Sequence, residues 1–280
     1  MKLLSTSFML PKINTKTKYS KLKALTLSGA ELGVPLNINQ NIFTNLHYGY
    51  DITTPEIIFL QFLIGYYTYN QDRLKDAQEY QQLELKQKEI YSTEKKELYE
   101  QLLENPEQYE YSYKLVFSLI TAIMLYNKNE INYSNLPLVI LLYSTNYYKE
   151  IKQKYPLIKP FYISTMWTLS TVILPCIIHD NNYDIFAYPT DYIPCFLSLF
   201  ATTNIADIKD IEEDAMANIK TFPVVYGLET TNAVVLICLS LSSLIFGLNE
   251  HYLDNPIVNI LFEIQNIGVA FVPLLSNYTL

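Results

Sequence analysis

Residues 231–248 read "TNAVVLICLSLSSLIFGL" and contain no charged residue, so this run could cross much of the roughly 30 Å hydrocarbon core of a bilayer. Further apolar runs lie near 52–69, 111–126, 134–148, 157–179, 190–206 and 255–275. Together they exceed what a soluble helical protein needs, so the sequence predicts an all-α fold, a polytopic transmembrane helix bundle. The alternative is a soluble all-helical protein with unusually apolar helices, which the mean hydropathy of +0.07 favours.

Charge is confined to a few blocks between these runs. Residues 77–110 hold nine glutamates against four lysines and are rich in helix formers, which predicts a polar helical excursion on the cytoplasmic side of the bilayer. The net charge of -8 argues against a nucleic-acid surface, because such a surface needs a basic face. Residues 1–23 are basic and free of acids, which predicts an N-terminal arm that sets topology before a single membrane domain at 24–280.

An acidic segment follows one apolar run and precedes another. Residues 202–227 read "TTNIADIKDIEEDAMANIKTFPVVYG", with Asp207, Asp210 and Asp214 spaced i, i+3 and i+7. On one continuous helix this spacing places the three carboxylates on a single face, where each close pair repels by roughly 3 kcal/mol at an effective dielectric constant of about 20. Lys209 and Lys220 are too few to offset this charge. A Mg²⁺ ion bound with substrate phosphates would offset it.

A smaller acidic cluster ends the apolar run at 52–69. Residues 66–80, "YYTYNQDRLKDAQEY", place Asp72 and Asp76 at i and i+4, again on one helix face. A single pair with this spacing is common in solvated loops. Two aspartate clusters that each begin as an apolar run ends are more informative, because ionisable groups at membrane depth are costly and usually functional.

The segment "NIADIKDIEEDAMANIKTFPVVYG" resembles the second aspartate-rich motif of the UbiA superfamily of intramembrane prenyltransferases. In that family a DxxDxxxD run leads into a Lys-Thr-x-Pro-Val segment. The matching residues here are Asp207, Asp210, Asp214, Lys220, Thr221, Pro223, Val224 and the closing Gly227. The spacing match is specific.

Two further segments carry the same resemblance. Residues 69–76, "YNQDRLKD", are similar to the variant first motif in which Tyr-Asn precedes Asp-Arg. Residues 141–160, "LLYSTNYYKEIKQKYPLIKP", are similar to the family's Tyr-Ser stretch followed by basic residues, here Tyr143, Ser144, Lys149, Lys152 and Lys159. The three segments and their spacing cover roughly residues 55–275, and the family typically has nine spans, so the expected count is about seven to nine.

The resemblance implies an Mg²⁺-dependent prenyltransferase that moves a prenyl group from an isoprenyl diphosphate to a lipophilic acceptor of the quinone, tocopherol or chlorophyll type. It assigns catalysis to Asp72, Asp76, Asp207 and Asp210, and metal binding to these four and Asp214. The diphosphate would meet Arg73, Lys149, Lys152 and Lys220. Cavity candidates are Asn70, Tyr143 and Trp167. Each basic residue could instead set topology, and for Lys149 and Lys152 the two roles fit equally well. For Tyr143 and Trp167 a role in packing fits better than one in lining the cavity.

Two other functions stay open. The same scaffold serves as a terpene cyclase, which needs no acceptor. A membrane transporter could instead use the aspartates as a cation pathway, although transporters typically carry unpaired acids deep within spans or broken, repeated helices. In this chain the acids lie at span ends next to lysines, which favours the handling of a diphosphate.

Overall fold

The computed structural model describes residues 33–34, 36–44, 48, 50–84, 88–89, 91, 93–127, 130–131, 135–155, 157–180, 183–184, 186–216, 219–248, 256, 259–264 and 266–267. The predicted basic arm at 1–23 and most of the apolar run at 255–275 lie outside this set. The sequence expectations for those two segments therefore stay predictions.

The described residues are almost entirely helical, which confirms the all-α class. The α-helices are α2 (Pro55–Gln82), α4 (Thr93–Glu104), α5 (Pro106–Leu125), α6 (Leu136–Tyr143), α7 (Tyr148–Lys154), α8 (Ile158–Thr168), α9 (Leu174–His179), α10 (Pro189–Lys209), α11 (Ile211–Met216) and α12 (Phe222–Gly247). A 3₁₀ turn, η2 (Ser144–Tyr147), and a π-helical turn, η3 (Leu169–Ile173), join helices. Strands β1 (Tyr126–Asn127) and β2 (Glu130–Ile131) form one short antiparallel pair.

Six of the seven predicted apolar runs coincide with these helices, but length and hydropathy single out only two in the described part of the chain. Ile158–His179 and Phe222–Gly247 are long and apolar enough to cross a membrane. Leu138–Tyr147 is apolar but shorter. The structure therefore supports an association with membranes, while the seven-to-nine-span topology is not established by it.

The predicted polar excursion at 77–110 is divided among three helices. Its first part continues α2 as far as Gln82, its middle forms α4, and its end forms the first turn of α5, which starts at Pro106. Tyr80 of α2 contacts Tyr91 and Tyr99, with ring centroids 5.2 and 5.4 Å apart, and thereby anchors α4 against α2. Part of this segment is thus packed onto the helical body.

The helix from Ile158 to His179 changes its winding in the middle. Pro175 has no N–H to donate to the carbonyl one turn earlier, and its ring would clash with that carbonyl in a regular α-helix. The π-helical turn η3 ends two residues before this proline and widens the helix there. The Ser170 carbonyl accepts a hydrogen bond from Gln61 Nε2 of α2 at 3.5 Å, so this turn also contacts the neighbouring helix.

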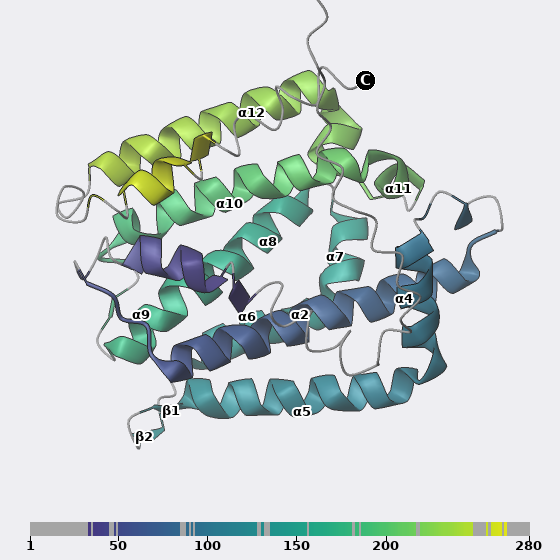
Figure 1. Ribbon diagram of the computed structural model, residues 1–280, viewed down its shortest axis with the longest axis horizontal. Coiled ribbons are helices and arrows are strands. Elements are labelled where there is room, and N and C mark those ends of the chain that lie inside the picture. The colour runs from purple at the N-terminus through teal and green to yellow at the C-terminus, as the bar shows by residue number, and fades with distance from the viewer. Residues whose placement is uncertain are drawn as a thin grey trace, which may run out of the picture.

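The helices pack on one another in layers (Figure 1). Helix α12 packs along α10, α10 packs on α8, and α2 packs on α5. The principal core cluster lies around α2 and α5 and includes Leu60, Ile64, Ile120 and Met124. The short helices α7 and α11 and the last part of α2 gather at one end of the molecule. Both aspartate clusters belong to segments at this end.

Candidate functional site

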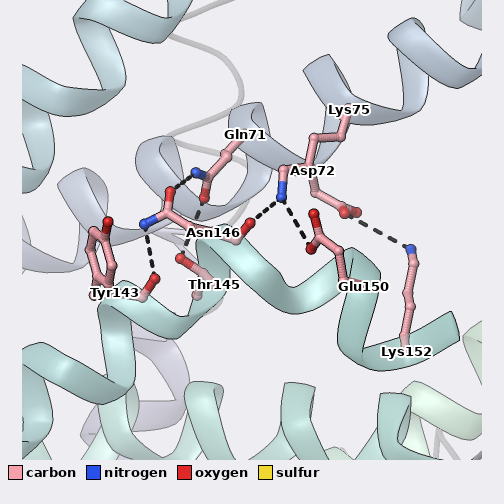
Figure 2. Close-up of polar contacts among 8 residues, drawn as sticks. All are labelled: Gln71, Asp72, Lys75, Tyr143, Thr145, Asn146, Glu150 and Lys152. Carbon is pink, nitrogen blue, oxygen red and sulfur yellow. Dashed lines mark hydrogen bonds and ion pairs between the residues drawn. The ribbon is translucent and has the colours of Figure 1, made fainter. Parts of the chain in front are cut away.

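The first aspartate cluster, Asp72 and Asp76, lies on α2 beyond its apolar half. Thr54 caps this helix by accepting a hydrogen bond from Ile57 N at 3.3 Å, and Pro55 occupies its first turn. Asp72 Oδ1 lies 3.9 Å from Lys152 Nζ of α7, as Figure 2 shows. The Lys152 side chain is only 5% exposed, whereas that of Asp72 is 38% exposed. A buried cation therefore faces a carboxylate that reaches water.

A polar interface holds η2 and the start of α7 against this part of α2 (Figure 2). Gln71 Nε2 and Lys75 Nζ donate hydrogen bonds to Asn146, to its side chain and its carbonyl respectively. Thr145 donates to Gln71 Oε1 at 3.4 Å, and Lys75 forms an ion pair with Glu150 at 3.8 Å. The segment that resembles the Tyr-Ser and basic stretch thus lies directly beside the segment that resembles the first motif.

The second aspartate cluster, Asp207, Asp210 and Asp214, is not on one continuous helix, which corrects the sequence expectation. Helix α10 ends at Lys209, Asp210 is its C-cap, and α11 begins at Ile211. The Asp210 N–H bonds to the Asp207 carbonyl at 3.2 Å, a tight turn that ends the α-helical pattern. Asp207 and Asp214 are nevertheless both buried, with exposed fractions of 2% and 6%.

Lys159 provides the positive charge between these two carboxylates. Its Nζ lies 2.7 Å from Asp207 Oδ1 and 3.1 Å from Asp214 Oδ2. The side chain is 14% exposed and comes from the first turn of α8. The sequence argument sought the offsetting charge in Lys209, Lys220 or a metal ion, and in the structure part of it comes from Lys159.

Burial governs the protonation of this cluster. Both carboxyl groups lie beyond the apolar run 190–206. Burial raises the pKa of Asp207 to about 6, although the ion pair with Lys159 opposes this shift. The pKa of Asp214 is also raised, again chiefly by burial and against the effect of Lys159. The nearby charge of Asp210 adds to both shifts. One lysine thus compensates only part of the cost of burying two carboxylates.

Tyr148 joins the two clusters. It is buried on α7 next to Lys152, the partner of Asp72. Its ring lies 5.0 Å from Lys152 Nζ and is stacked on Tyr162 at 4.9 Å. The hydroxyl itself has no hydrogen-bond partner among the described residues. Tyr148 thus connects Lys152, the partner of Asp72, with α8, the helix that carries Lys159.

The remaining predicted basic residues, Arg73, Lys149 and Lys220, lie in different environments. The Arg73 guanidinium stands over the ring of Tyr69 at 4.1 Å on α2. Lys220 is exposed, and its carbonyl accepts a hydrogen bond from Leu157 N at 3.1 Å. Leu157 has a φ of 66°, an uncommon left-handed conformation that this bond helps to hold directly before α8. Lys149 belongs to α7, but its side chain lies outside the described residues.

The three cavity candidates are also spread out. Asn70 is buried on α2 and donates to the Tyr66 carbonyl at 2.9 Å. The Tyr143 ring is 47% exposed and contacts Phe117, with ring centroids 5.5 Å apart. Trp167 packs against a separate core cluster. The members of that cluster include Phe43, Val172, Cys176 and Phe246.

Two observations bear on whether the carboxylates of this site could bind a divalent cation. No three His, Cys, Asp or Glu side chains form a metal-binding group in the part of the chain that the structure describes. Within that same part, the buried Asp207 Oδ2 has no hydrogen-bond partner, which leaves one carboxylate oxygen able to take a ligand. Mg²⁺ often binds through only one or two protein carboxylates, with phosphate and water completing its shell. Asp207, Asp210 and the α2 aspartates are the residues that would hold it.

Comparison with protein-family models, curated proteins and solved structures finds no match to this chain. The likeness to UbiA prenyltransferases therefore rests on the three sequence segments alone.

Sequence reasoning missed the roles of Lys159 and Tyr148. Lys159 was noted only as one of several basic residues, although it is the single Lys, Arg, Asp or Glu within the apolar run 157–179. An ionisable residue inside a predicted span is a functional candidate by default, so a signal was present. Tyr148 carried no comparable signal, because it is one of 25 tyrosines.

Proposed function

We propose that this chain is an Mg²⁺-dependent prenyltransferase that moves a prenyl group from its diphosphate to a lipophilic acceptor, for which we favour an aromatic compound. The observation that carries the proposal is a chain of contacts between the two clusters: Lys152 pairs with Asp72 and lies over the Tyr148 ring, and that ring stacks on Tyr162 of α8, the helix whose Lys159 pairs with Asp207 and Asp214. Two carboxylate clusters connected in this way match the need of a diphosphate for bridging metal ions, because carboxylates alone would repel it.

The residues of the chain supply binding and charge. Lys152 and Lys159 lie next to the aspartates and can donate charge-assisted hydrogen bonds to phosphate oxygens. Arg73, Lys149 and Lys220 remain further candidates from the sequence. Bound Mg²⁺ would act as a Lewis acid that stabilises the departing diphosphate. In the reaction the carbon–oxygen bond to the diphosphate breaks, the prenyl carbon bonds to the acceptor, and the acceptor loses a proton.

The aromatic side chains beside the cluster suit a carbon centre that becomes positively charged. Tyr148 and Tyr162 present a stacked pair, and Tyr162 OH lies 2.7 Å from Ser144 Oγ. Aromatic faces stabilise cations by up to about 2 kcal/mol when both are desolvated. Because Tyr148 is 9% exposed, this face is largely shielded from water, which would otherwise capture the cation.

We further propose that the helices form a multi-pass membrane bundle. Exposed apolar side chains form stripes at helical spacing on several helices. They include Tyr111, Leu115 and Leu119 on α5, Leu136 and Ile140 on α6, and Ile237, Leu241, Leu244 and Leu248 at and beyond α12. Ile237 and Leu244 are 59% and 60% exposed. Contiguous apolar surface of this kind is unfavourable in water and favourable against lipid tails.

A direct assay tests the proposed function. Membranes that contain the protein are incubated with a labelled prenyl diphosphate and a panel of quinone precursors, chlorophyll-type alcohol acceptors and haem. We expect transfer of label with Mg²⁺ and none with EDTA, and a loss of at least about 100-fold in Asp72→Asn and Asp210→Asn. Asp51→Asn is the matched control, because its exposed carboxylate accepts the Thr53 N–H at 2.8 Å, which an asparagine side chain can also do.

The outcomes of this assay separate the alternatives. Full activity in either cluster variant would refute the metal assignment. Release of a cyclised hydrocarbon without an acceptor would identify a terpene cyclase instead. A protein that consumes no diphosphate but carries cations across vesicle membranes would be a transporter.

A further inference from the structure

Lys159 lies between the two buried carboxylates of the second cluster. Lys159 Nζ is 2.7 Å from Asp207 Oδ1 and 3.1 Å from Asp214 Oδ2. These distances are typical of charge-assisted hydrogen bonds. A divalent cation that bridged the same two carboxylates would have to displace or approach the ammonium group, and the two positive charges repel each other.

The surroundings point to a ligand beyond this lysine. The second oxygen of Asp207, Oδ2, and the hydroxyl of Tyr148 are both buried and have no hydrogen-bond partner within the described residues. Asp207 is 2% exposed and Tyr148 is 9% exposed, so water does not readily compensate them. Buried polar groups are normally paired, and such exceptions require an explanation. A ligand that brings both positive charge and hydrogen-bonding oxygens would satisfy both atoms.

We infer that Lys159 is a built-in cation that holds the second aspartate cluster until a divalent metal and a diphosphate bind together. This inference rests on the proposed function. When the diphosphate arrives, its oxygens offer Lys159 a new anionic partner, and the carboxylates become available to the metal. Lysine suits this exchange because its ammonium has three rotatable donors on a flexible four-carbon stem.

The exchange makes metal and diphosphate binding interdependent. Without diphosphate, the metal competes with Lys159 and binds weakly. With diphosphate, Lys159 has another partner, so the metal affinity rises. Linkage requires the metal to raise the diphosphate affinity by the same factor, typically about 5- to 150-fold for coupled sites. Lys159 is thus a positioning residue that acts through the carboxylates and through the order in which the ligands assemble.

The test measures binding by the purified full-length chain in detergent and does not depend on turnover. Equilibrium dialysis gives the protein-bound Mn²⁺, as a stand-in for Mg²⁺, with and without inorganic pyrophosphate. We expect the unaltered protein to bind Mn²⁺ at least about 10-fold more tightly with pyrophosphate than without it. We expect Lys159→Met to bind Mn²⁺ alone at least about 10-fold more tightly than the unaltered protein, with a smaller gain from pyrophosphate.

Two control variants keep the result specific. Lys159→Arg retains the charge and should bind Mn²⁺ alone as weakly as the unaltered chain. Lys154→Met removes an exposed lysine of α7 that lies over the Tyr155 ring at 5.3 Å, and should change neither affinity. If Lys159→Met does not fold, the effect of pyrophosphate on the Mn²⁺ affinity of the unaltered protein still tests the inference. An Mn²⁺ affinity that pyrophosphate leaves unchanged overturns it.

The failure of this inference differs from the failure of the proposed function. Tight Mn²⁺ binding by the unaltered protein without pyrophosphate, equal to that of Lys159→Met, overturns the role of Lys159 and leaves the metal site in place. No binding of Mn²⁺ or pyrophosphate by any variant overturns both.

Discussion

Asp72 and Asp207 belong to similar sequence patterns but lie in different environments. The Asp72 side chain is 38% exposed and lies 3.9 Å from Lys152, whereas the Asp207 side chain is 3% exposed and lies 2.7 Å from Lys159. An exposed carboxylate keeps most of its hydration, so its ion pair contributes little to stability. A buried carboxylate depends on its partner, because the cost of removing it from water is otherwise uncompensated. The second cluster should therefore contribute to both stability and ligand binding, and the first chiefly to ligand binding.

The largest expected effect is on the free energy of unfolding of Lys159→Met. This change leaves Asp207 and Asp214 buried without their cation, which should lower the free energy of unfolding by about 3–5 kcal/mol. Denaturant unfolding of the metal-free protein in detergent, followed by the fluorescence of Trp167, measures it.

Lys152→Met is the matched control on α7. Its partner Asp72 can be hydrated when the lysine is removed, so we expect a loss of no more than about 1 kcal/mol. Equal losses in the two variants would contradict the contrast between the two clusters.

A smaller effect should appear in the pH dependence of stability. The folded-state pKa of Asp207 is about 6, above the value near 4 expected in the unfolded chain. Between these values the folded protein binds more protons than the unfolded chain, so the free energy of unfolding of the metal-free protein should fall as pH rises from about 4 to about 6. Asp207→Asn should flatten this slope, and Asp214, whose pKa is also raised, should retain part of it.

The control for the slope is Asp51→Asn, which alters an exposed carboxylate remote from the cluster in sequence and should leave the pH dependence unchanged. A slope that is the same in Asp207→Asn and in the unaltered protein would show that the burial of Asp207 does not control its protonation.

Much of the fold could be predicted from the sequence, because apolar runs of this length exceed a typical strand and predict helices. The runs at 157–179 and 231–248 coincide with two helices that, among the described residues, are long and apolar enough to cross a membrane. The break at Asp210 was missed, because the i, i+3, i+7 pattern assumes one helix and does not register the tight turn after Asp207. The helical structure within residues 77–110 was predicted, but the packing of Tyr80, near the end of α2, against Tyr99 of α4 was not.

The candidate site was only partly predictable, for a related reason. Spacing along the chain identified the aspartates, which are local patterns. The pairing of Lys159 with Asp207 joins α8 to the end of α10, and the position of Tyr148 on α7 depends on the contacts of α7 with α2 (Figure 2). Such contacts follow from tertiary packing, which no local pattern in one sequence specifies.

The central claim is that the two aspartate clusters form one site. The most direct test is a double-mutant cycle of Asp72→Asn and Asp207→Asn on the affinity for Mn²⁺ with pyrophosphate, measured by equilibrium dialysis. A shared site predicts that each single change weakens binding at least about 10-fold, and that the double variant loses less than the product of the two factors, a coupling of about 0.5–3 kcal/mol. Independent effects that multiply, or an affinity that neither change alters, would contradict it.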